Sequence, residues 1–372
     1  MTTTMTDVRT EAVDRAPDAA PGVDLDRVQA FAVKVATDAA AAKAGALAYI
    51  GDRLGIWTAL ATAGPTTSAG LAARSGLAER YVREWLATQA AIGYVEYDVT
   101  TDRFHLPAEH AAVLADETST AFLGSAFEVN VGLYAAIDRV SAAFRTGEGI
   151  PWGEHDPRLY RGVDRFFRTL YERSLVAEWL PAVPGAVEML ESGTRVLDVG
   201  CGHGSAVVML AQAFPSSTFV GVDPHEGSIA TARAAADAAG VADRVEFRVG
   251  SADDEVGSSY GLVFYFDAFH HVGDPEAAAR RARAALAPGG ALVLVEPRAQ
   301  DRLADNLDLV GLTYYGASAM VCVPDALAQG AEDALGGQAG YQRLRSVLTS
   351  AGFGVVRLAA EADFNLVVEA RA

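Results

Sequence analysis

The chain has few cysteines, few basic residues and no long hydrophobic run. Only two of its 372 residues are cysteines, Cys201 and Cys322, so we expect no framework of structural disulfides and predict a reducing compartment. Neither cysteine is spaced with histidines as in a zinc motif, and the sequence therefore predicts no metal site. No apolar run has the length of a membrane span, and residues 1–22 lack the apolar core of a signal peptide. These absences predict a cytoplasmic protein without a membrane partner.

Basic side chains are outnumbered, with 30 Lys and Arg against 48 Asp and Glu and a formal net charge of -18. Nucleic-acid phosphates are bound by clustered Lys and Arg, so this balance argues against a nucleic-acid partner and favours a small-molecule one. Hydrophobic residues make up 51% of the chain, which is ample for burial. A chain of this length exceeds one ordinary core, so we expect two domains.

The first half of the chain has helical periodicity. Residues 1–22 are predicted to be a disordered tail and residues 23–116 a winged-helix domain that mediates dimerisation. Within this domain Gly76 forms a turn, residues 78–92 form the second helix, and "YVEYD" and "RFHLP" pair as a small hairpin. Residues 117–190 are predicted to be a helical linker that contributes to the substrate pocket.

In residues 191–372 the sequence pattern changes, and short β-rich runs alternate with helical ones. This alternation predicts an α/β fold with a parallel sheet covered by helices. The last two strands have no helix between them, so the final strand should be antiparallel. The predicted strands cover residues 194–199, 217–222, 244–249, 261–266 and 290–296 and two runs within 354–370; the predicted helices cover residues 204–213, 227–239, 275–287 and about 341–351.

Three glycines, Gly200, Gly202 and Gly204, follow the first of these strands in the stretch "VLDVGCGHG". Loops at the carboxyl ends of parallel strands bind ligands, and a loop without side chains lets a ligand lie on the backbone. A phosphate-binding loop would need a Lys before its Ser or Thr, and a dinucleotide loop prefers G-x-G-x-x-G. The carboxylate of Asp198 would repel a pyrophosphate. A cationic ligand without phosphate fits better, and S-adenosylmethionine, with its ammonium and sulfonium groups, is such a ligand.

The next two strands also end in polar residues. Asp223, in "FVGVDPHEGS", ends the second strand, where a carboxylate can accept hydrogen bonds from both ribose hydroxyls. Ser251 and Ala252, in "RVGSADD", end the third strand and would border the adenine. Each motif alone also fits an ordinary turn or helix cap, but three in order at successive strand ends predict a nucleoside-containing cofactor.

The motifs "VLDVGCGHG", "GVDPH", "GSADD", "FDAFHHVGDP" and "LAPGGALVLVEP" stand in this order over residues 194–297. In this order they resemble the class I S-adenosylmethionine-dependent methyltransferases, and with the winged helix the chain is similar to two-domain bacterial members and to plant-type small-molecule O-methyltransferases. The resemblance implies a Rossmann-like seven-stranded sheet with an antiparallel last strand and S-adenosyl-L-methionine as the cofactor. It also implies that Phe266 lies under the methionine part of the cofactor and that His225 belongs to the cofactor site.

The resemblance also implies where the chemistry lies. In plant-type O-methyltransferases a His-Asp pair follows the fourth strand and its His is the base; "HHVGDP" places His270 at that position, with His271 in place of the Asp. Glu296 matches a carboxylate that orients the base, and such a carboxylate fixes a histidine's tautomer. A structural or substrate-orienting role for His270, or metal ligation, stays open, and His271 is expected to support His270.

Candidate acceptor-pocket residues are Tyr314 and Tyr315, in an insertion at residues 305–324, and Trp152 and His155 in the linker. The predicted function is methyl transfer to a small molecule, with a hydroxyl acceptor favoured. Transfer to nitrogen or carbon without a dedicated base, and use of the bound cofactor to steer another reaction, are the alternatives.

The alternative function from a different class is that of a winged-helix transcriptional regulator. Residues 1–110 hold 10 Lys and Arg against 14 Asp and Glu, and the charges on helix 78–92 cancel. A helix that reads a DNA groove needs surplus positive charge, so we expect this domain to form a homodimer interface and a wall of the acceptor pocket.

Overall fold

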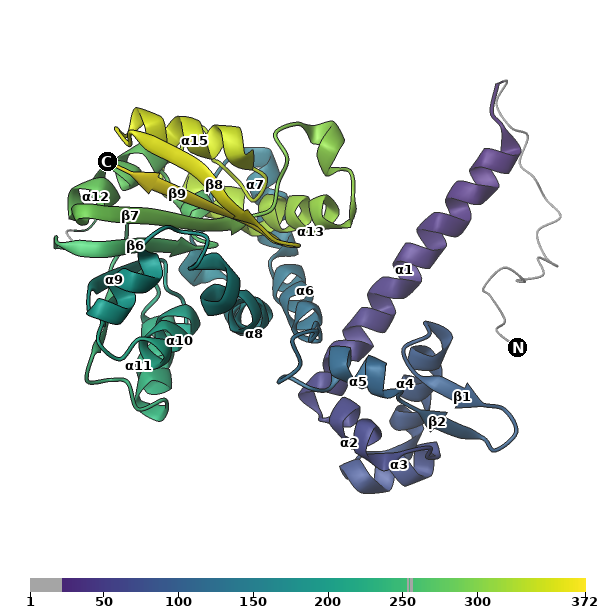
Figure 1. The fold of residues 1–372 in the computed structure, drawn as a ribbon. Helices are drawn as coiled ribbons and strands as arrows, with labels where there is room; N and C mark the ends of the chain where they lie inside the picture. Colours follow the sequence, from purple (N-terminus) through teal and green to yellow (C-terminus); the bar gives the residue numbers. More distant parts are fainter. Residues whose placement is uncertain (1–21, 253, 255–256) are drawn as a thin grey trace.

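The computed structural model describes residues 22–252, 254 and 257–372. Except for Gly22, the predicted disordered tail therefore lies outside the described residues. The chain forms a helical N-terminal part and an α/β C-terminal part, which are joined by long helices (Figure 1).

The C-terminal part is built on a seven-stranded sheet with the order β5-β4-β3-β6-β7-β9-β8. Strands β3 to β7 pair in parallel, whereas β9 is antiparallel to both β7 and β8. The predicted α/β fold with an antiparallel last strand is thus confirmed. The strands are β3 (Arg195–Val199), β4 (Thr218–Asp223), β5 (Val245–Val249), β6 (Tyr260–Phe266), β7 (Leu286–Pro297), β8 (Val355–Glu361) and β9 (Asn365–Arg371).

Helices cover both faces of this sheet, which explains why its central strands are continuously apolar. Successive side chains point to opposite faces, so Val196 joins one core cluster and Leu197 the other. Helices α9 (Ala186–Ser192), α10 (Ser205–Ala213) and α11 (Glu226–Ala238) pack on the Val196 face, and α12 (Pro275–Ala285) and α15 (Gly340–Ser350) on the Leu197 face.

The N-terminal part has the predicted winged-helix arrangement of helices and a hairpin. The helix predicted at 78–92 is α4, and the predicted hairpin is formed by β1 and β2. Its core includes Trp57 and Trp85, whose rings meet edge to face with centroids 4.5 Å apart. The elements are α1 (Leu25–Arg53), α2 (Ile56–Ala63), α3 (Ser68–Ser75), α4 (Glu79–Ala91), β1 (Glu96–Asp98), β2 (Arg103–His105) and α5 (Ala108–Leu114).

The two parts are connected through α8. Gly132 and Gly162 let α6 and α8 pack closely, since a Cβ on either glycine would lie within 2.7 Å of the other helix's backbone. Arg165 of α8 forms ion pairs with Asp52 of α1 at 2.8 Å and with Glu128 of α6 at 2.9 Å. The connecting elements are α6 (Ser125–Ala135), α7 (Ile137–Thr146), the 3-10 turn η1 (Trp152–Glu154), α8 (Pro157–Ser174) and the π-helical turn η2 (Leu175–Trp179).

The insertion at 305–324 is largely helical and packs on the segment before α8. The backbone N–H of Ile150 donates to the carbonyl of Pro324 at 2.8 Å. This contact brings the insertion next to the loop that follows β6, which itself contains the 3-10 turn η3 (Phe269–His271). The helical pieces of the insertion are η4 (Leu303–Asn306), α13 (Leu309–Ala317), the π-helical turn η5 (Ser318–Cys322) and α14 (Val323–Ala328).

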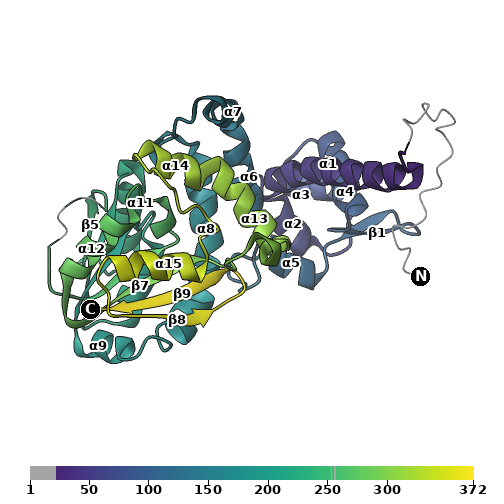
Figure 2. The same ribbon diagram turned by 90° about the horizontal axis from the view of Figure 1, so that it is seen from above.

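Helix α1 projects away from the rest of the chain along most of its length (Figures 1 and 2). Every residue from 22 to 43 is exposed, including the apolar Val28, Phe31 and Val35. Within the described ranges, no helix combines the length and hydropathy required of a membrane span.

Candidate active site

A pocket lies at the carboxyl ends of β3, β4 and β6, with α8 forming its opposite wall. Its empty volume is about 1060 Å³, which includes space open to solvent. A crevice at this edge of an open α/β sheet is the usual ligand site of such folds. Five acidic residues line it and, among the described residues, no lysine or arginine does; the acidic ones are Asp164, Asp198, Asp223, Asp267 and Asp325.

The glycine loop between β3 and α10 forms the floor of this pocket. Gly200, Gly202 and Gly204 all have positive φ, at 79°, 52° and 78°. A Cβ on Gly204 would lie 2.6 Å from the ring of Phe247, and one on Gly200 would lie 2.5 Å from Cβ of Ala268. A Cβ on Gly202 would meet open space. Two of the glycines therefore permit close packing, while Gly202 leaves the backbone bare toward the pocket.

Two buried carboxylates flank this loop: Asp198, at the end of β3, and Asp223, at the end of β4. Asp198 is almost fully buried, and its Oδ1 has no hydrogen-bond partner in the described part of the chain. Burial, and then the neighbouring Asp223, raise the pKa of Asp198 well above its usual range. Asp223 accepts hydrogen bonds from the backbone N–H groups of Gly202 and His225, both at 2.9 Å. These bonds orient the Asp223 carboxylate, while burial raises its pKa.

A third carboxylate enters from α8, and the sequence interpretation missed it. Asp164 accepts a hydrogen bond from the hydroxyl of Ser205 at 2.5 Å and lies 3.7 Å from Nδ1 of His203. Burial opposes ionisation of Asp164, but its hydrogen bonds to His203 and Ser205 outweigh this and lower its pKa. The available signal was an acidic residue on the apolar face of α8, three positions before Phe167 and therefore on the same side of the helix.

His270 and Glu296 form the pair that the sequence predicted. Nδ1 of His270 lies 2.7 Å from Oε2 of Glu296, and both side chains are nearly inaccessible to solvent. Burial lowers the pKa of His270, but the Glu296 carboxylate more than compensates, so the pKa of His270 is raised. Asp267, just before this turn, accepts hydrogen bonds from Asn365 and Tyr171.

His271 has a carboxylate partner of its own, which sequence reasoning missed. Its Nδ1 lies 3.0 Å from Oδ2 of Asp325 on α14. Burial lowers the pKa of His271, but the hydrogen bonds and charges of Cys322 and Asp325 raise it to about 9. His270 and His271 thus each pair with a buried carboxylate, from different segments of the chain.

The remaining predicted residues differ in where they lie relative to the pocket. Ser251, Ala252, Phe266 and Trp152 line the pocket. His225 lies beside it, with Nδ1 2.8 Å from the Ser228 hydroxyl. Tyr314 and Tyr315 are not among the residues that line this pocket, and the Tyr314 hydroxyl donates to the carbonyl of Phe364 at 2.7 Å. His155, a further linker candidate, is buried and neither of its ring nitrogens has a hydrogen-bond partner among the described residues.

Comparison with known proteins identifies two domains in the chain. Residues 190–352 match the model of a methyltransferase domain, and residues 42–116 match that of an Rv2258c-like winged HTH domain. The chain thus carries a methyltransferase domain behind a winged helix. The methyltransferase domain supplies the sheet edge of the acid-lined pocket, and α8 supplies the opposite wall.

Relatives and solved structures support the same assignment. The chain is 36% identical over 104 residues to a ubiquinone biosynthesis O-methyltransferase of Azorhizobium caulinodans and 34% identical over 116 residues to one of Bordetella avium. These matches cover 27% and 30% of this chain but only 40% and 45% of the relatives, so the chain spans less than half of their length.

Over nearly its whole length, the chain has the fold of two solved structures. One is a putative O-methyltransferase from Nostoc punctiforme, with a TM-score of 0.67, 22% identity and coverage of 94% of this chain and 100% of the other. The other is human N-acetylserotonin methyltransferase in complex with SAM, with a TM-score of 0.68, 17% identity and coverage of 95% and 99%.

The residues of the pocket fit S-adenosylmethionine. An unpartnered carboxylate oxygen on Asp198 and the acidic lining favour a cation, and the lack of a lining Lys or Arg among the described residues disfavours a phosphate. Asp223 keeps free lone pairs for ribose hydroxyls, because each carboxylate oxygen accepts more than one hydrogen bond. Bare backbone at Gly202 leaves room for the ligand.

Proposed function

We propose that this protein transfers the methyl group of S-adenosylmethionine to a hydroxyl of a small-molecule acceptor. The observation that carries the proposal is the convergence of two features at one sheet edge. The acid-lined glycine loop follows β3, and the carboxylate-paired His270 follows β6, the strand next to β3. A cofactor bound at the glycine loop would therefore lie beside His270.

We propose the following roles in cofactor binding. Asp223 accepts hydrogen bonds from the ribose hydroxyls, and Ser251 and Ala252 border the adenine. Asp164 and Asp198 face the cationic methionine end, which Phe266 supports from below. The pocket lining and the unpartnered oxygen of Asp198 support these roles.

The cofactor supplies a methyl carbon already activated by the sulfonium. The chain has to align the acceptor oxygen in line with that carbon and accept the hydroxyl proton. We propose that Nε2 of His270 takes this proton, because Glu296 engages Nδ1 and leaves Nε2 with the lone pair. The acceptor O–H bond breaks, the O–CH₃ bond forms, and the electron pair of the S–CH₃ bond stays on sulfur.

A variant pair tests the proposal. Asp223→Ala should weaken binding of S-adenosylhomocysteine strongly in titration calorimetry, since the ribose loses its acceptor. His270→Ala should bind it normally yet turn over roughly 100-fold more slowly with a hydroxyl acceptor. Unchanged turnover of His270→Ala would assign the protein to amine or carbon acceptors that need no base.

Charge pairing on α4 argues against a DNA-binding role for the winged helix. Arg83 forms an ion pair with Glu79 at 2.9 Å, and Arg80 forms one with Glu84, all within the helix. Each Arg is thus engaged on the helix itself. We expect no salt-sensitive binding to random duplex DNA in a filter assay.

We also propose that α1 pairs with a second copy of this chain. A lone helix is marginal in water, yet every residue from 22 to 43 is exposed in the part of the chain that the structure describes. Val28, Phe31 and Val35 share one face of α1 at helical spacing, which is typical of a helix that packs against another. Light scattering should give a dimer for the full chain and a monomer for Val28→Glu/Phe31→Glu; a monomeric full chain at micromolar concentration would contradict the proposal.

A further inference from the structure

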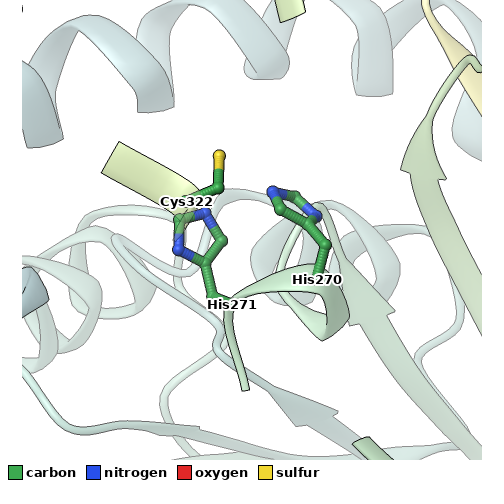
Figure 3. Close-up of side chains that lie close together, drawn as sticks. All are labelled: His270, His271 and Cys322. Carbon is green, nitrogen blue, oxygen red and sulfur yellow. The ribbon is translucent and has the colours of Figure 1, made fainter. Parts of the chain in front are cut away.

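Three side chains of metal-ligating type converge beside the proposed active site. His270 and His271 come from the 3-10 turn after β6, and Cys322 comes from the insertion about fifty residues later. One potential ligand atom from each lies within 4.8 Å of the other two. Figure 3 shows the two imidazoles and the thiol gathered around one point.

Both imidazoles are held in the orientation that a metal ligand requires. Nδ1 of His270 lies 2.7 Å from Glu296, and Nδ1 of His271 lies 3.0 Å from Asp325. In the neutral imidazole, a carboxylate on Nδ1 keeps the remaining proton there, so that Nε2 carries the lone pair that coordinates a metal. One such pair would fit a catalytic base, but two adjacent pairs match the outer shell of a two-histidine metal site.

The two carboxylates are themselves anchored in the same way. The second oxygen of Glu296 accepts from the backbone N–H of Phe269 at 2.9 Å, and the second oxygen of Asp325 accepts from that of Trp152 at 2.8 Å. Both carboxylates are at most 4% exposed. The two carboxylates are therefore fixed by the backbone, and metal binding would need little reorganisation of this outer shell.

Cys322 supplies a soft third ligand. It ends the π-helical turn η5, directly before α14, and π-helical turns occur frequently at functional sites. Its side chain is buried. The same α14 carries Asp325, so one short segment delivers both the thiol and the outer-shell partner of His271.

We propose that His270, His271 and Cys322 form a three-ligand site for a divalent transition metal, with zinc as the best match. Zinc takes imidazole nitrogens and thiolate sulfurs as ligands, and its catalytic sites have three protein ligands with the fourth position open. Tetrahedral zinc with bonds of about 2.0–2.3 Å sets its ligands roughly 3.5 Å apart, so the cluster needs only a modest contraction. His271 and Asp325 line the pocket, which places the open position toward the acceptor.

This inference deepens the proposed function, and it rests on that function for the identity of the fourth ligand, a hydroxyl or thiol of the acceptor. A metal that coordinates such a group lowers its pKa and so performs the task assigned above to His270. In the metal-loaded protein, Nε2 of His270 is a ligand; in the metal-free protein it is the base.

Metal binding is measured on the full chain, purified under reducing conditions without chelator. Zinc content and competition with a chromophoric chelator should give one zinc per chain. Cys322→Ser should lower zinc affinity at least 100-fold, whereas Cys201→Ser, the matched control at the other cysteine, should leave the stoichiometry unchanged. Asp325→Asn, which alters only the outer shell, should cost roughly 10- to 100-fold.

Cobalt provides a readout that does not depend on activity. Co²⁺ bound to the wild type should show a thiolate charge-transfer band and the intense d–d bands of tetrahedral geometry, both lost in Cys322→Ser. No zinc at micromolar concentrations, or equal loss in Cys322→Ser and Cys201→Ser, would overturn the site. Calorimetry with S-adenosylhomocysteine on the same samples separates this failure from failure of the proposed function, because the cofactor pocket does not include Cys322.

Discussion

Nδ1 of His270 and Oε2 of Glu296 lie 2.7 Å apart in a region closed to solvent, and Oε1 of the same carboxylate holds the backbone N–H of Phe269. The carboxylate therefore fixes both the imidazole and the turn that carries it. A buried hydrogen bond of this kind is strong, and leaving one partner unpaired is costly. The pair thus determines where Nε2 points.

Glu296→Gln should reduce turnover roughly 100-fold while S-adenosylhomocysteine binds within about twofold of wild type. The amide keeps the shape of Glu296 but cannot both hold the Phe269 N–H and fix the proton on Nδ1 of His270. Steady-state kinetics and calorimetry measure the two effects. Equal losses in turnover and cofactor affinity would instead indicate a general distortion of the site.

Asp198→Asn should stabilise the cofactor-free protein by about 1–3 kcal/mol while it weakens cofactor binding. Asp198 is buried with an unpartnered oxygen, so the uncharged amide removes a desolvation cost. Urea unfolding measures the free energy of unfolding. Asp237→Asn, at an exposed position on α11, is the control and should change neither quantity.

Asp198 and Asp223 should contribute stability to the cofactor-free protein that is lost as pH rises. Burial raises the pKa values of both residues above their ordinary value of 3.8, so the folded state binds these protons more tightly than the unfolded state. Their contribution is complete below the unfolded-state pKa of 3.8 and is lost as pH rises through the raised folded-state pKa values. Urea midpoints at several pH values check the direction, and Asp198→Asn should flatten the slope.

Gly204→Ala should destabilise the fold by about 2–4 kcal/mol, whereas Gly202→Ala should cost about 1 kcal/mol and mainly weaken cofactor binding. Both residues have positive φ, but only a Cβ on Gly204 collides, 2.6 Å from the ring of Phe247. Thermal unfolding and calorimetry separate the two outcomes. Similar unfolding temperatures for both variants would contradict the packing argument.

Arg165→Ala should destabilise the protein by about 3–5 kcal/mol, because it leaves the buried carboxylate of Glu128 and the mostly buried Asp52 without this partner. Arg168→Ala is the matched control on the same helix. Arg168 pairs only with Glu117, at 3.4 Å and with greater exposure, so its loss should cost less than about 1 kcal/mol. Equal losses in the free energy of unfolding for the two variants would contradict the proposal that Arg165 connects the N-terminal and C-terminal parts.

The cofactor pocket could be predicted because its determinants are local. Asp198 and the glycines are contiguous with β3, and Asp223 directly ends β4, so strand periodicity alone placed them at one sheet edge. Predicted and observed strands agree closely for the same reason. The winged helix could also be predicted, because turn residues and helical periodicity are local features of the sequence.

Sequence alone thus determined the α/β sheet, the glycine loop and the nucleoside-binding acids, because each depends on neighbours along the chain. Only the tertiary structure decided which distant side chains complete the site. Asp164 reaches Ser205 across 41 residues, and Asp325 reaches His271 across 54. Such pairs depend on how α8 and the insertion pack on the sheet, and no periodicity or local motif encodes that packing.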